Sequence, residues 1–137
     1  MSQPGDSRRI ALVLDTSAIL AYAAGSMYVH EPVLLAGEAG EDVAVPVHCL
    51  IEAVRRDPSV DLRELLHLDQ VVTVMPDRHS DADLFADWTI YLNGREDAAA
   101  AAVLTYRHQA GLLTGEPHQY TIAGEQPDWV IPIDGRW

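Results

Sequence analysis

Residues 10–17 read Ile-Ala-Leu-Val-Leu-Asp-Thr-Ser, a continuous apolar run that ends in a carboxylate and two hydroxyls. An apolar run of this length, bounded by polar groups, predicts a buried strand of a parallel sheet. Asp15 then lies at the carboxyl end of that strand. Ligands of open α/β sheets bind in the crevice outside those ends, so Asp15 is a candidate functional residue. The alternative is that Asp15 only caps the following helix, a role that Ser17 or Thr16 can also take.

The chain length and composition predict one domain. The 137 residues can bury most of the apolar surface that they expose when unfolded. We expect residues 1–9 to be a flexible tail and residues 10–137 to form a single domain. The sequence shows neither a membrane-span pattern nor a signal-peptide pattern, which predicts a cytoplasmic protein with no membrane contact. Cys49 is the only cysteine, so an intrachain disulfide and a cysteine-based zinc site are excluded. We expect it to be a buried, inert thiol.

The charge of the chain is strongly acidic. A formal net charge of −12 argues against a general affinity for nucleic acid, which depends on neutralising phosphates. That objection weakens if some of the acids form a cluster that holds divalent cations, because the ions bring positive charge into the site. All nine basic residues are arginines. Arginine binds phosphate in a bidentate way, although a compositional bias of the genome gives the same usage.

Strand and helix patterns alternate along the chain. Short apolar or β-branched runs predict strands over residues 10–14, 43–46, 71–75, 111–114 and 129–133. Helical patterns lie between most of them, over residues 18–24, 30–39, 48–56, 59–68, 80–92 and 96–106. This alternation predicts an α/β fold, a three-layer α/β/α sandwich with a central, mostly parallel sheet.

Several helix starts carry specific signals. Pro32 suits the first turn of the helix over 30–39, and Ser59 suits the cap of the next-but-one helix. We expect the helix over 80–92 to begin at Ser80, with its early acids forming a solvated start that favours the helix dipole. Five alanines from Ala98 to Ala102 follow two acids and let the last helix approach the sheet closely.

Four carboxylates follow strands or begin helices. Asp15 and Glu116 follow the first and fourth strands, while Glu52 and Asp97 lie early in two helices. In a parallel sheet all four would converge at one carboxyl-end crevice, where their repulsion is costly without cations. Hard oxygen ligands suit Mg²⁺ or Mn²⁺ rather than zinc. Two such ions can activate water and stabilise the leaving oxygen in phosphodiester cleavage.

Taken together, these motifs resemble the PIN-domain family from about Ile10 to Ile133. The resemblance rests on Leu12-Val-Leu-Asp-Thr-Ser17, on Val45-Pro46 followed by Glu52, on Asp97 opening an alanine-rich helix, and on Leu112-Leu-Thr-Gly-Glu116. It implies a PIN-like α/β/α domain and a metal-dependent ribonuclease similar to the VapC toxins of bacterial toxin–antitoxin pairs.

The resemblance also implies roles for single residues. Asp15, Glu52 and Asp97 match the three acids that hold the metal in this family, and Asp97 rather than its neighbour Glu96 fits the pattern. Glu116 matches a fourth position that more often carries aspartate, so its contact with metal is either direct or through water. Ser17 and Thr114 match hydroxyls that support the acids or a bound water. Each of the two can instead cap a helix or bond to the backbone.

The sequence therefore predicts a Mg²⁺- or Mn²⁺-dependent endoribonuclease that cleaves RNA, the toxin of a type II toxin–antitoxin pair. Its expected partners are an RNA substrate, a cognate antitoxin or a second copy, the last two bound through helical faces around Val33-Leu-Leu35 and Leu62 to Leu66. Arg55 and Arg56 either reach substrate phosphates or form a solvated helix end. A catalytically idle PIN-like domain that binds RNA or protein is the alternative. A receiver-like or haloacid-type phosphoryl-transfer domain needs a late lysine, which the chain lacks.

Overall fold

A computed structural model describes residues 8–133 and shows a central five-stranded sheet in which every strand pairing is parallel. The strand order is β3-β2-β1-β4-β5. The sheet confirms the predicted α/β class. The strands are β1 (Ile10–Leu14), β2 (Asp42–Pro46), β3 (Val71–Val74), β4 (Gly111–Thr114) and β5 (Val130–Pro132).

The strand order reverses direction at β1. The chain proceeds from β1 outward to β2 and β3, and then returns to the other side of β1 to form β4 and β5. In the register of the two inner strands, Leu14 of β1 lies beside Leu113 of β4. The residues that follow, Asp15 and Thr114, therefore flank the point at which the sheet order switches. Such a switch point opens a crevice at the carboxyl edge of the sheet, where α/β proteins bind ligands.

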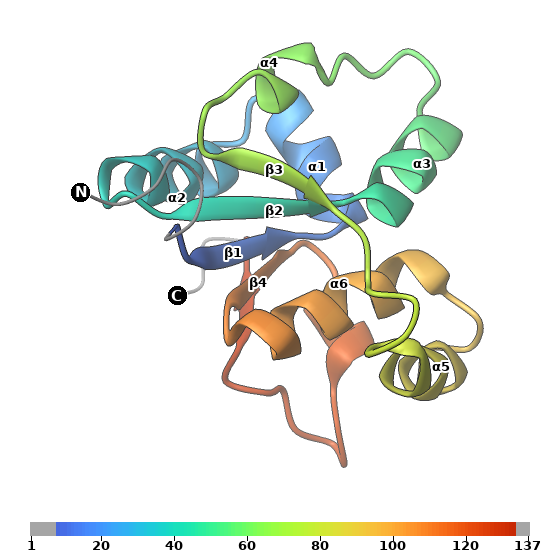
Figure 1. Cartoon of the computed structure of the whole chain (residues 1–137). Helices are drawn as coiled ribbons and strands as arrows, with labels where there is room; N and C mark the ends of the chain where they lie inside the picture. The colour runs from blue at the N-terminus through green and yellow to red at the C-terminus, as the bar shows by residue number, and fades with distance from the viewer. Residues whose placement is uncertain (1–7, 134–137) are drawn as a thin grey trace.

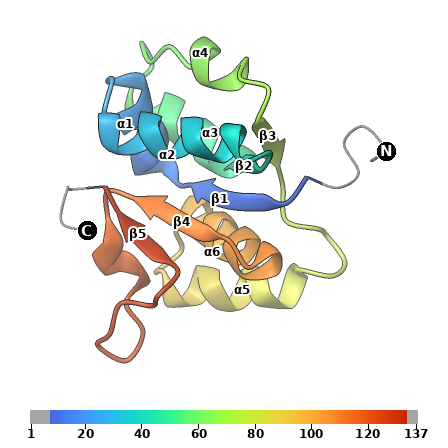
Figure 2. The same cartoon turned by 90° about the vertical axis from the view of Figure 1, so that its left-hand side faces the viewer.

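Helices cover both faces of the sheet, as Figures 1 and 2 show from two directions. One layer contains α1 (Thr16–Ala23), α2 (Met27–Glu38) and α3 (Val47–Arg56), with the short α4 (Arg63–Leu66) beyond them. The other contains α6 (Glu96–His108), which packs on the sheet, and α5 (Ala82–Tyr91), which packs on α6. A 3₁₀ helix, η1 (Pro117–Tyr120), follows β4.

The alanine run of α6 forms the centre of the layer that contains α5 and α6. Each side chain from Ala98 to Ala102 is at most 1% exposed. These small side chains let the helix lie against β1, β2, β4 and α3 at once. This close packing brings the first turn of α6, which carries Asp97, to the carboxyl edge of the inner strands.

Three predicted helix starts are wrong. Helix α2 begins at Met27, so Pro32 lies inside it, where the missing N–H leaves one backbone bond unmade. Ser59 does not cap a helix; it hydrogen-bonds Asp57, and α4 is a single turn that begins at Arg63. Helix α5 begins at Ala82 rather than at Ser80. Of its early acids, Asp83 and Asp87 are exposed as expected, but the N-cap residue Asp81 is buried and paired with Arg107.

The described residues cover most of the predicted domain but little of the predicted tail. Residues 1–7 of the predicted 1–9 tail lie outside the described residues, as do residues 134–137 of the predicted domain. Arg8 contacts Asp42, the first residue of β2, and Arg9 contacts Glu41, which precedes it. Within residues 8–133, no helix is long and apolar enough to cross a membrane.

Candidate functional site

Asp15 is buried where β1 passes into α1. Its carboxylate is 2% exposed and caps α1 by accepting a hydrogen bond from the Ala18 N–H at 3.0 Å. The same Oδ1 accepts from the Ser17 hydroxyl at 2.7 Å, and Oδ2 accepts from the Tyr120 hydroxyl at 2.8 Å. Asp15, rather than Ser17 or Thr16, is thus the cap of α1, and it also takes part in a polar network that a cap does not require.

Burial and hydrogen bonding act on the charge of Asp15 in opposite directions. Burial raises the pKa of the carboxyl above its ordinary value, since a charged carboxylate loses its hydration there. The hydroxyl and backbone donors lower the pKa but do not cancel the effect of burial. A carboxyl with a raised pKa and a specific donor set is a mark of functional sites.

Two hydroxyls connect Asp15 to the end of β4. The Ser17 hydroxyl lies 3.4 Å from the Thr114 hydroxyl and accepts a hydrogen bond from the Gly115 N–H at 2.8 Å. Thr114 in turn accepts from the Glu116 N–H at 2.9 Å. Both hydroxyls therefore orient the backbone that presents Glu116. Ser17 supports Asp15 directly, and the Thr114 hydroxyl also helps to lower the pKa of Asp15 but reaches Glu116 through its backbone N–H.

Asp97 faces the same point from the first turn of α6. Its Oδ2 accepts from the Thr16 hydroxyl at 2.7 Å, while the neighbouring Glu96 is exposed. Burial tends to raise the pKa of Asp97. The Thr16 bond and the guanidinium of Arg95 outweigh burial and hold that pKa below its ordinary value. Asp97, and not Glu96, is therefore the acid that the structure brings into the network.

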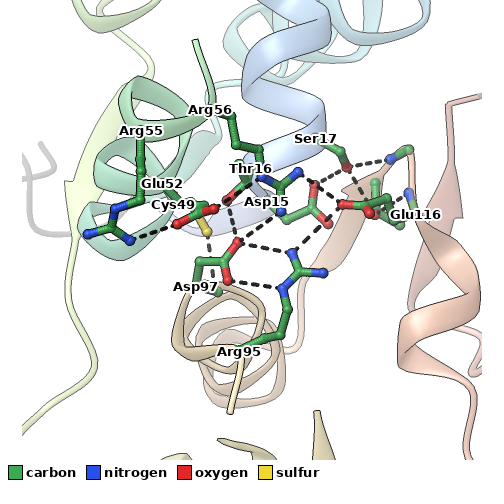
Figure 3. A network of polar contacts seen from close by, with 12 residues as sticks. Asp15, Thr16, Ser17, Cys49, Glu52, Arg55, Arg56, Arg95, Asp97 and Glu116 are labelled. Atoms are coloured by element: carbon green, nitrogen blue, oxygen red, sulfur yellow. Dashed lines mark hydrogen bonds and ion pairs between the residues drawn. The ribbon is translucent and has the colours of Figure 1, made fainter. Parts of the chain in front are cut away.

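Glu52 and Glu116 are joined to Asp97 by two arginines. Arg56 lies 3.2 Å from Glu52, 3.4 Å from Glu116 and 3.9 Å from Asp97. Arg95 lies 3.3 Å from Asp97 and 3.8 Å from Glu116. Figure 3 shows the two guanidinium groups among the carboxylates. The four predicted acids thus belong to one connected network, and Arg56 and Arg95 neutralise much of its charge.

The donor chemistry of this network fits a hard divalent cation. Its free ligands are carboxylate oxygens and hydroxyls, and the only nearby thiol, Cys49, is buried and donates to the Asp97 carbonyl at 3.2 Å. The present arrangement is nevertheless not a finished metal centre. Among the described residues, no group of three or more His, Cys, Asp or Glu side chains is placed to hold an ion. Arginine nitrogens instead lie 2.8 Å from Glu52, 3.3 Å from Asp97 and 3.4 Å from Glu116, whereas Asp15 contacts hydroxyls and a backbone N–H.

An open cavity of about 460 Å³ lies beside the network, between α3 and the start of α6. Its lining includes Glu52 and Asp97 from the network and the basic side chains of Arg55, Arg95 and His48. Arg55 and Arg56, which are adjacent in the sequence, point in different directions. Arg55 points outward, with its side chain 71% exposed and bound only to Glu52, whereas Arg56 points into the network. The cavity gives an extended ligand direct access to two of the acids.

Sequence reasoning missed three members of the network. Arg95 precedes the acidic start of α6 and could have been noticed there as a candidate counter-ion. Thr16 was considered only as a cap, although it adjoins Asp15. Tyr120 gave no signal, because its bond to Asp15 spans 105 positions and depends on the path of η1. His48 also lines the cavity, and its Nδ1 is buried without a hydrogen-bond partner among the described residues.

Comparison with solved structures finds a similar fold. One matching chain comes from a structure titled "Toxin-antitoxin complex from Klebsiella pneumoniae". The match has a TM-score of 0.63 and 13% sequence identity, and it covers 90% of this chain and 98% of that one. At this identity the likeness concerns the fold. Neither the protein-family models nor the curated proteins searched give a match to the sequence.

Proposed function

We propose that this protein is a Mg²⁺- or Mn²⁺-dependent endoribonuclease of the PIN-domain type and the toxin of a toxin–antitoxin pair. The observation that carries the proposal is the convergence of four carboxylates, from four separate segments, at the switch point of a parallel sheet. The match to a chain of a toxin–antitoxin complex over nearly its whole length supports the same assignment.

Within this proposal the residues have distinct tasks. Asp15, Glu52 and Asp97 would hold the cation, with Glu116 at the outer side, since its side chain is 41% exposed. Ser17, Thr16 and Tyr120 orient the buried carboxylates through their hydroxyls. The bound cation would supply positive charge that polarises the phosphodiester. RNA would enter along the cavity, where Arg55 and Arg95 can contact phosphates.

The proposal is tested by titrating the purified protein with Mn²⁺ in a calorimeter and by incubating it with labelled single-stranded RNA. A ribonuclease of this type binds Mn²⁺ and cleaves the RNA only when the metal is present. A catalytically idle domain is the second candidate, favoured by the pairing of the acids with Arg56 and Arg95. It predicts binding of RNA or protein without cleavage at any metal concentration.

RNA binding should depend on divalent ions more than on monovalent salt. The net charge of −12 makes the electrostatic contribution unfavourable over most of the surface, so affinity has to come from the cavity and its ions. We expect added Mg²⁺ to strengthen binding more than a lower NaCl concentration does, as measured by fluorescence anisotropy. Arg55→Gln should weaken binding, and Arg78→Gln, in the exposed segment before α5, should not. Tight binding in EDTA that falls steeply with salt would contradict this placement of the site.

The helical face of α2 is a candidate surface for the antitoxin or for a second copy. Val33 and Leu65 are buried, but Met27, Leu34 and Leu35 are more than half exposed. Met27 and Leu34 line an open groove of about 400 Å³ beside α4. We expect Leu34→Asp to weaken association, because it places a charge in an apolar contact.

Light scattering of the protein alone, and of the protein co-expressed with a candidate antitoxin, measures this effect. Ile90→Asp is the matched control, since Ile90 is 77% exposed on α5 in the other layer. A wild-type protein that stays monomeric at high concentration and copurifies with no small protein would rule out both forms of association.

A further inference from the structure

Arg56 and Arg95 occupy an unusual position for surface arginines. Their side chains are only 31% and 34% exposed, and both point into the acidic network rather than into solvent. Arg56 reaches three of the four carboxylates and Arg95 reaches two. Asp97 and Glu116 each contact both arginines. The guanidinium groups therefore bridge acids that belong to three different segments.

In this arrangement the two arginines offset the repulsion among the carboxylates without a metal ion. Like-charged carboxylates held together by the fold repel one another, and the repulsion must be offset by positive charge. A guanidinium can bridge several carboxylates because its N–H donors point in fixed, divergent directions. Carboxylate oxygens that face a guanidinium are not free to bind a second cation. That competition concerns Glu52, Asp97 and Glu116, whereas Asp15 contacts no arginine among the described residues.

We propose that Arg56 and Arg95 are resident counter-ions of the site, and that a divalent cation binds only by displacing them from the carboxylates. This inference rests on the proposed metal-dependent function and concerns how that site is regulated. The two arginines make the site responsive to the cation concentration, because binding has to compete with an intramolecular ion pair that is present at all times. Once displaced, both side chains remain beside the cavity that admits the substrate.

The test compares Mn²⁺ affinity, measured by calorimetry on the full chain without RNA, in wild type, Arg56→Gln, Arg95→Gln and the double variant. Removal of a competing cation should strengthen Mn²⁺ binding, by roughly tenfold in the double variant. Arg63→Gln is the control, because it removes the same charge but breaks only an exposed contact with Asp61, outside the network. Its effect should stay below about threefold, in the range of an exposed ion pair.

A second readout is the melting temperature in EDTA and with Mn²⁺. The double variant should melt earlier than wild type in EDTA, because its carboxylates have lost their counter-ions, and should gain more from added Mn²⁺. If it does not fold, Arg56→Lys and Arg95→Lys serve instead. A lysine keeps the charge but cannot bridge several carboxylates, so these variants should bind Mn²⁺ more tightly than wild type.

The outcomes separate this inference from the function on which it rests. Equal Mn²⁺ affinity in wild type and the double variant would overturn the proposal that the cation displaces the arginines. It would leave the metal site itself in place. Equal gains in Arg63→Gln and Arg56→Gln would also overturn that proposal, because they would show a general effect of charge. Absence of Mn²⁺ binding in every variant would overturn the proposed function itself.

Discussion

Asp15→Asn is expected to lower Mn²⁺-dependent RNA cleavage by about a thousandfold, the loss that follows when several kcal/mol of metal-assisted stabilisation is removed. Asparagine has the same shape and can still accept from Ser17 and from the Ala18 N–H, so the fold should be retained. A single-turnover cleavage assay and a circular dichroism spectrum check the two expectations. Asp83→Asn, at an exposed position of α5, is the control and should keep full activity.

The same variant should make the metal-free protein more stable at neutral pH. Burial raises the pKa of Asp15, so the folded state binds its proton more tightly than the unfolded state does. That contribution to stability is fully present below the ordinary pKa of aspartate and is lost as the pH rises through the raised value. Asparagine has no proton to lose there.

Melting temperatures in EDTA, measured from acidic to neutral pH, test whether this contribution to stability is lost as the pH rises. The advantage of Asp15→Asn over wild type should grow as the pH rises. An advantage that shrinks over that range, or a variant less stable than wild type at neutral pH, would show that the buried charge stabilises the fold.

Arg107→Ala is expected to lower the free energy of unfolding by about 2 kcal/mol, because it leaves the buried carboxylate of Asp81 without its counter-ion. Asp81 is 4% exposed and accepts hydrogen bonds from Arg107 and from the Asp77 N–H. Arg107 also donates to the Ser80 carbonyl and so fixes the segment before α5 against α6. Its own side chain is 43% exposed, which keeps the loss below that of a fully buried pair.

Urea denaturation measures this change, and two further variants assign its cause. Arg63→Ala breaks an ion pair with Asp61 whose side chains are 83% and 59% exposed, and should cause no measurable loss. Asp81→Asn combined with Arg107→Ala should be more stable than Arg107→Ala alone, since the uncompensated charge is gone. An equal loss in the single and the double variant would assign the effect to packing of the arginine stem instead.

The sheet could be predicted from the sequence because buried parallel strands leave a simple mark. Strands covered on both faces read as short continuous apolar runs, and all five expected runs are strands in the structure. Helix starts were less predictable, because capping signals are local and compete with tertiary contacts. Ser59 satisfies the Asp57 turn instead of a helix, and Pro32 is tolerated inside α2 because packing of that helix outweighs one lost backbone bond.

The acids of the candidate site were predictable, and their partners were not. Asp15 and Glu116 follow strands whose carboxyl ends meet, so topology alone places them near each other. The bridges of Arg56 and Arg95 depend on which way each side chain leaves its backbone. No spacing rule links Arg56 on α3 to Glu116, because that contact crosses 60 positions of the chain.

The bond between Asp15 and Tyr120 bears on how the protein is made. During synthesis Asp15 emerges early, whereas β4, Glu116 and Tyr120 are added more than 95 residues later. Until then β1 lacks one of its two neighbouring strands, and the carboxylate of Asp15 lacks the hydroxyl that closes over it. A nascent chain on the ribosome therefore carries only part of the acidic network. Assembly of the site is postponed until translation has passed the last of these residues.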